Sequence, residues 1–194
     1  LTDFIRKDFQ IHLGDNSAQF TQLGVLSYFE SIRREIIEQS WTVPVAVLTG
    51  SLVIIPTSAK EHLERLIPNS RLSYDVIGQL SQEDYLKVSV SGSHHDLVTA
   101  LTQLFQEGHI QVIIGTKSLL GEGWDAPCVN SLILASFVGS FMLSNQMRGR
   151  AIRVWPDNPN KTSNIWHLVS INLSPRRWFD FQDEEEKFNE TLEL

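Results

Sequence analysis

Apolar residues follow two different spacings along this chain. Between residues 17 and 39 they recur every three or four positions, which predicts an amphipathic helix, N-capped by Ser17, that packs against the rest of the protein. Short apolar-rich runs follow, and residues 52–56 form a continuous apolar run that is typical of a strand buried on both faces of a parallel sheet. The other runs are residues 110–114, 132–135 and 165–171, and Trp166 and His167 break the alternation of the last.

Helical patterns alternate with these runs. The spacing predicts helices over about residues 59–67, 96–106 and 140–154, and a charged helix over 175–194. Short strands are predicted at 72–77 and 87–90, whereas residues 45–48 fit either a strand or part of a turn. This alternation predicts an α/β fold with a mainly parallel sheet flanked by helices.

The charge and composition of the chain argue against several classes of protein and of metal site. The 194 residues include 23 Asp and Glu against 16 Lys and Arg, and this net charge of −7 argues against an indiscriminate nucleic-acid-binding protein. Residues 174–194 contribute −4 of it, so the remainder could still hold a local basic groove. The single cysteine, Cys128, excludes an internal disulfide and a thiolate metal site, and the pair His94-His95 lacks further ligands.

Two further features of the sequence favour a cytoplasmic protein. No apolar run is long enough to cross a membrane, and no secretory leader opens the chain. The start at Leu1 suggests a fragment cut from a longer polypeptide.

Three arginines lie within six positions, at 148, 150 and 153, in a chain where basic residues are scarce. On a helix, Arg150 and Arg153 would leave one face, and Gln146 would lie one turn before Arg150. The planar guanidinium fork matches phosphate oxygens, so this segment could grip a polyphosphate. Gly149 would let a ligand or another backbone approach. An exposed basic helix turn without a ligand fits the same residues.

Two further loops follow predicted strands. Thr57 or Ser58 comes after the run 52–56, where either hydroxyl could contact a ligand or simply cap the next helix. The segment 115–127 follows the run 110–114 and carries glycines, Trp124 and Asp125. Asp125 could also serve as a turn carboxylate and Trp124 as a core aromatic. Because the carboxyl ends of parallel strands share one edge of a sheet, these loops and the arginines could line one surface.

Together these segments resemble the motifs of the second RecA-like domain of superfamily-two helicases and translocases. Residues 52–57 resemble motif IV, 115–127 resemble motif V, and 146–153 resemble motif VI. The motif wording is closest to DEAD/DEAH-like helicases and the motor subunits of restriction enzymes, and the resemblance covers about residues 45–172. It implies a RecA-like three-layer sandwich, divided into a helical or linker segment over 1–45, the helicase C-terminal domain over 46–172 and an acidic tail over 173–194.

The resemblance also implies a role for each site residue. Arg150 and Arg153 would be arginine fingers that reach the γ-phosphate of ATP on a partner domain, and Gln146 would arrange that phosphate or the attacking water. Asp125 would contact the ribose, and Gly123 would offer its backbone near the nucleotide. Nucleic-acid contacts are implied for three residues: Thr116, Thr57 and Lys117.

The chain lacks the other half of such an ATPase. A Walker loop needs Gly-Lys followed by Ser or Thr, and none of the six lysines follows a glycine. The acidic run 183–186 has no buried strand before it and is interpreted as a solvated helix face. ATP and Mg²⁺ would therefore be held mainly by an N-terminal RecA-like domain of the same parent polypeptide, and this chain would be inactive alone. Nucleic acid, with DNA ahead of RNA, is the other expected partner.

Two alternatives belong to other classes. The fold could be a non-catalytic module that binds nucleic acid or protein and uses the arginines only for phosphate contacts. A nucleotide-sugar transferase with a similar α/β half is disfavoured by the glutamine and paired arginines on one predicted helix.

Overall fold

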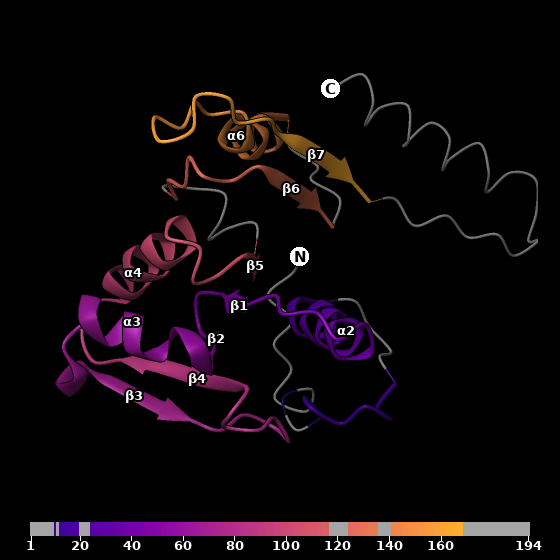
Figure 1. Ribbon diagram of the computed structural model, residues 1–194, viewed down its shortest axis with the longest axis vertical. Coiled ribbons are helices and arrows are strands. Elements are labelled where there is room, and N and C mark those ends of the chain that lie inside the picture. The colour runs from indigo at the N-terminus through magenta and orange to yellow at the C-terminus, as the bar shows by residue number, and fades with distance from the viewer. Residues whose placement is uncertain (1–9, 11, 20–23, 117–123, 136–140, 169–194) are drawn as a thin grey trace, which may run out of the picture. The chain divides into compact units, whose positions relative to one another are not determined.

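The computed structural model describes residues 10, 12–19, 24–116, 124–135 and 141–168, with the backbone alone at 69 and 141–144 (Figure 1). The chain divides into two compact units, Leu1–Cys128 and Val129–Leu194. The division falls inside the range 46–172 that was predicted as one domain.

The first unit alternates strands and helices. Its helices are α2 (Val25–Glu38), η1 (Thr57–Ala59), α3 (Lys60–Leu66), η2 (Asn69–Arg71) and α4 (His94–Gln106). Its strands are β1 (Val45–Leu48), β2 (Val53–Pro56), β3 (Leu72–Asp75), β4 (Tyr85–Val90) and β5 (Val112–Gly115). Residues 45–48 are therefore a strand, and the other predicted elements except α2 lie within a few residues of their predicted positions.

The sheet of the first unit is mixed. Its order is β3-β4-β2-β1-β5, and only the β1–β5 pair among the described ladders of this sheet is parallel. The predicted α/β class is confirmed, but this sheet is not mainly parallel as predicted. Four residues, 49–52, join β1 to β2, and so short a connection forces the strands to run antiparallel. An apolar run favours a buried strand, but it carries no information on the direction of that strand.

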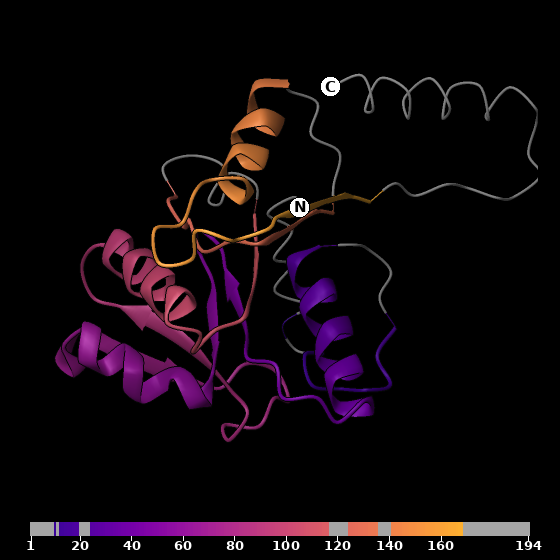
Figure 2. The ribbon, with the colours of Figure 1, turned by 45° about the horizontal axis from the view of Figure 1, so that its top comes forward.

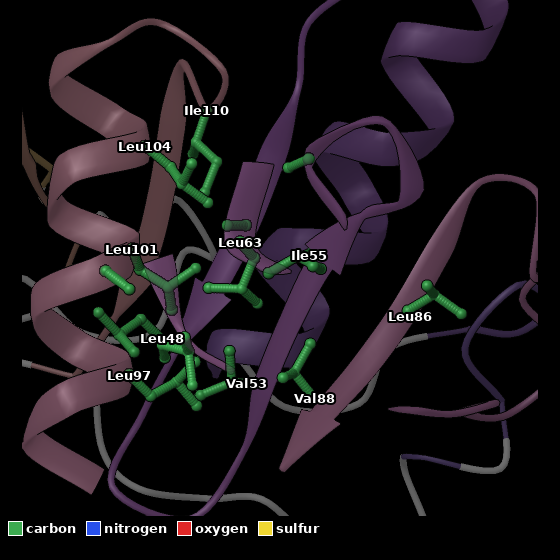
Figure 3. Packing of buried hydrophobic residues seen from close by; sticks show 14 residues of the cluster. Leu48, Val53, Ile55, Leu63, Leu86, Val88, Leu97, Leu101, Leu104 and Ile110 are labelled. Atoms are coloured by element: carbon green, nitrogen blue, oxygen red, sulfur yellow. The ribbon is translucent and has the colours of Figure 1, made fainter. Parts of the chain in front are cut away.

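Alternate strand residues enter two apolar clusters, one on each face of this sheet. Ala46 and Leu48 of β1 join the cluster with α3 and α4, whereas Val45 and Val47 join the cluster with α2. Figures 1 and 2 show α2 on the opposite side of the sheet from α3 and α4. Figure 3 shows the α3–α4 cluster, with labelled members Leu48, Val53, Ile55, Leu63, Leu86, Val88, Leu97, Leu101, Leu104 and Ile110.

Helix α2 begins later than predicted. Ser17 does not cap it, because the Ser17 hydroxyl donates to Asp15 Oδ1 at 2.6 Å. The helix instead begins after Gly24, whose backbone N–H donates to Ser27 Oγ at 2.7 Å. It packs on β1 and β5, which confirms the predicted docking of this helix on the body of the protein.

A buried cluster of charged side chains on α2 binds residues 14–16, which precede the helix. The Glu30 side chain is fully buried and accepts from Arg33 Nε at 2.8 Å and Arg34 Nε at 3.1 Å. It also accepts from the backbone N–H of Gly14 at 3.2 Å, and Arg33 reaches Asn16 Oδ1 at 2.6 Å. The hydrogen bonds that Arg33 donates to the Glu30 carboxylate raise the pKa of Arg33. Residues 14–16 are thereby held against α2 by a carboxylate whose charge is paired.

The second unit contains a parallel strand pair and a helix. Strands β6 (Ser131–Leu134) and β7 (Asn164–His167) pair in parallel, and α6 (Phe141–Ala151) contacts both. The predicted tail helix lies outside the described residues. None of the helices in the described ranges has both the length and the apolar character that a membrane span requires.

Candidate functional site

Thr57 lies directly after β2, as the sequence predicts, but its hydrogen-bonding groups have local partners. Its hydroxyl donates to the carbonyl of Gln82 at 2.7 Å, and its backbone N–H donates to the carbonyl of Asp84 at 2.9 Å. The helix-capping alternative is wrong for Thr57 and for Ser58, because neither η1 nor α3 has a side-chain cap. Phosphate oxygens only accept, so Thr57 could donate to a nucleic-acid backbone only by releasing Gln82.

Thr116 immediately follows β5 and is 1% exposed. In this conformation its side chain faces the protein interior, and a direct contact with a nucleic-acid backbone would require it to be uncovered. Lys117 and Gly123, the neighbouring site residues predicted from the sequence, lie outside the described residues.

Trp124 is anchored to α4. Its indole Nε1 donates to Thr102 Oγ1 at 2.8 Å, and its ring lies 6.4 Å from that of Phe105 between centroids. The Thr102 hydroxyl in turn donates to the carbonyl of Val98 at 2.7 Å. Trp124 therefore packs against α4 at a half-buried position and does not belong to either buried apolar cluster of the first unit.

This anchoring presents Asp125 to solvent. Trp124 is half-buried, Asp125 is exposed and Ala126 is buried, so the carboxylate lies between two residues that are held by the protein. Thr102 is a residue that the sequence analysis missed. Thr102 and Trp124 are 22 positions apart, so the sequence does not indicate their hydrogen bond, which forms only when α4 and the loop lie together in the fold.

The arginine-bearing segment is partly helical. Met147 and Ala151 form the buried side of α6, Gln146 is exposed and Arg150 is half-buried. Helix α6 ends at Ala151, so the predicted helix over 140–154 is too long at its C-terminus. Arg153 is exposed in the turn beyond it, where its backbone N–H donates to the carbonyl of Arg150 at 3.3 Å. The two arginines therefore remain one turn apart, although only Arg150 belongs to the helix.

Open space surrounds the glycine of this segment. A Cβ atom added at Gly149 would meet no atom within 4 Å. The predicted room for a ligand or a second backbone thus exists beside Gln146 and Arg150. These residues supply a cation and an amide, which suit the oxygens of a phosphate.

Two side chains hold the turn after α6. Lys161 Nζ donates to the carbonyls of Arg153 and Val129, each at 2.8 Å. The Ser163 hydroxyl donates to the carbonyl of Ala151, the last residue of α6. Sequence analysis missed Lys161 and Ser163, because both act on carbonyls eight or more positions away. They fix the backbone at the base of Arg153.

Metal ligands do not gather in the described part of the chain. No group of three or more His, Cys, Asp or Glu side chains there could hold an ion. His94 and His95 begin α4, where the His95 backbone N–H donates to Ser93 Oγ at 3.2 Å. Among the described residues of the arginine-bearing segment, the groups suited to phosphate oxygens are the amide of Gln146 and the guanidinium groups of Arg150 and Arg153.

Comparisons of the chain with protein-family models, with curated proteins and with solved structures gave no match. The family resemblance therefore depends on the motifs themselves.

Proposed function

We propose that this chain is the C-terminal motor domain of an ATP-dependent nucleic-acid helicase or translocase, whose partner domain carries the Walker loop. The observation that carries the proposal is the end of α6. Gln146 and Arg150 lie one turn apart on the helix, Arg153 lies one turn further, and a Cβ atom added at Gly149 would meet no atom within 4 Å.

The chemistry of phosphoryl transfer explains why this arrangement suits ATP. Negative charge spreads over the γ-phosphate oxygens during transfer, and an arginine aimed at them accelerates hydrolysis by about 10³–10⁵-fold in related enzymes. Arg150 and Arg153 would supply that charge from this side of the nucleotide. Gln146 would orient the phosphate or the water, and Asp125 would accept from a ribose hydroxyl.

The fold is compatible with the proposal in part. The α/β class and the parallel β1–β5 and β6–β7 pairs fit a RecA-like domain, while the antiparallel β1–β2 and β3–β4 hairpins are departures. The motif residues after β5 and those on α6 belong to different units, so each group supports the proposal by itself.

The test uses the polypeptide that joins this chain to its Walker domain. Arg150→Ala and Arg153→Ala should each lower kcat for ATP by about 10³-fold or more while nucleotide binding is retained. Arg148→Ala is the matched control, because Arg148 lies on the same helix, outside the face shared by Gln146 and Arg150, and it should keep near-normal turnover. Unchanged kcat in both finger variants would refute the assignment.

A non-catalytic phosphate-binding module is the second candidate. Arg148 and Arg150 lie in the last turn of α6, where cations are stabilised by the helix C-terminus without any ligand. If this candidate holds, Arg150→Ala should weaken oligonucleotide binding equally with and without ATP, and no Walker loop should precede the chain in its reading frame.

A further inference from the structure

Among the residues that the structure describes, an apolar face of the β6–β7 pair is exposed. Ile133 and Trp166 are register partners in this parallel ladder, so their side chains lie on the same face, and they are 58% and 59% exposed. Leu168, two positions after Trp166, continues this face and is 50% exposed, and its N–H donates to the carbonyl of Leu134 at 3.0 Å. On the other face Leu134 is 4% exposed. Parallel sheets are normally covered on both faces, so we expect another segment or a partner to cover this face.

We propose that the C-terminal segment 176–194 of this chain is that occupant. Its sequence provides a matching surface, because at helical spacing four apolar residues fall on one side: Trp178, Phe181, Phe188 and Leu192. Phe179 falls on the opposite side, among the acidic residues.

Reach and charge both favour this segment over a separate partner. Seven residues, 169–175, separate it from Leu168, and such a linker spans up to about 25 Å. Residues 129–168 carry four cations against Asp157 alone, whereas residues 174–194 carry seven acids against three cations. A short tether also raises the effective concentration of the segment to the millimolar range, which disfavours displacement by a second copy.

Hydrogen exchange on the full chain tests the proposal. Phe181→Ser or Phe188→Ser should accelerate amide exchange in β6 and β7 by about tenfold or more, because the covering segment is released. Phe179→Ser is the matched control: it removes the same side chain two positions away, and it should leave β6 and β7 protected as in the original chain. Equal protection in all three variants would overturn the proposal.

Cysteine pairing provides a readout that does not depend on stability. In a Cys128→Ser background, Ile133→Cys combined with Phe181→Cys should form an intramolecular disulfide at least about tenfold faster than Ile133→Cys combined with Phe179→Cys. Equal rates for the two pairs would mean that the segment is tethered without docking. Disulfides between chains in place of within them would assign the face to a second copy. Either result contradicts the proposal.

Discussion

Glu30 is the residue with the greatest calculable consequence for stability. Its buried carboxylate neutralises Arg33 and Arg34, and its removal would leave the buried Arg33 without its ionic partner. Glu30→Ala should therefore lower the free energy of unfolding by about 3–5 kcal/mol. Glu38→Ala, at an exposed position of the same helix, should change it by less than about 0.5 kcal/mol. Chemical denaturation measures both, and similar values for the two variants would contradict this account.

Trp124 and Trp155, whose indole N–H groups both donate hydrogen bonds in the described part of the chain, permit a matched comparison. Trp124 donates to Thr102 in a partly buried setting, whereas Trp155 donates to Asp157 at 3.2 Å in an exposed one. Trp124→Phe should cost about 1 kcal/mol more than Trp155→Phe, because only the first leaves a partly buried partner without its donor. Denaturant titration measures the free energy of unfolding of both variants. A larger loss of this free energy in Trp155→Phe would contradict the proposed anchoring of the Asp125 loop.

The raised pKa of Tyr74 leads to a predicted loss of stability of the protein at alkaline pH. Burial, and then the charge of Glu64, raise the pKa of Tyr74 from 10.0 to about 12. The unfolded chain therefore loses this proton first, so the stability contributed by neutral Tyr74 is fully present below pH 10 and is lost as the pH rises towards 12. Tyr74→Phe should reduce the fall in unfolding free energy between pH 10 and pH 11.5.

The residual slope in that variant has an identifiable source. Burial also raises the pKa of Tyr85, which packs edge-on against Phe29 with ring centroids 5.0 Å apart. Measurements at pH 8 provide the baseline, since both tyrosines are neutral there in the folded and unfolded chain. An unchanged alkaline slope in Tyr74→Phe would show that its phenol is not held neutral.

At the scale of elements, the turn after α6 depends on Lys161. Its ammonium group ties the carbonyl of Arg153 to that of Val129, next to β6. Lys161→Met keeps most of the side-chain length but removes both donors, and it should cost about 1.5–3 kcal/mol and accelerate amide exchange over residues 152–163. Lys60→Met is the control, because Lys60 is partly exposed and its carboxylate partner lies 3.9 Å away. Comparable amide exchange over residues 152–163 in both variants would contradict the stabilising role of the Lys161 hydrogen bonds.

At the scale of the whole molecule, the proposed function predicts an inactive chain. No lysine follows a glycine anywhere in the 194 residues, so no Walker loop is present to hold the β- and γ-phosphates. The purified chain should therefore show no ATP turnover above background, with or without an oligonucleotide. An assay of released phosphate, with Arg150→Ala as the matched control, provides the measurement. Turnover that Arg150→Ala abolishes would mean that the chain carries a complete catalytic site.

Sequence by itself determined the features that depend on neighbouring residues. Apolar runs predicted strands at β2, β5 and β6, although only β2 among these three is buried along its whole length. Three- and four-residue spacing predicted α3 and α4, since that spacing places one apolar stripe on a helix. The cluster of arginines and the missing Walker loop are also readable directly, because they are matters of residue identity.

Only the tertiary structure decided strand direction, burial of charge and the anchoring of loops. The β1–β2 reversal depends on a short connection, which an apolar pattern does not encode. The buried Glu30 accepts from Gly14, 16 positions earlier in the chain. Helix α6 ends at Ala151, whose carbonyl accepts from Ser163, and Lys161 donates to the carbonyl of Arg153 beyond it. These outcomes depend on partners distant in the chain, whose proximity arises from packing.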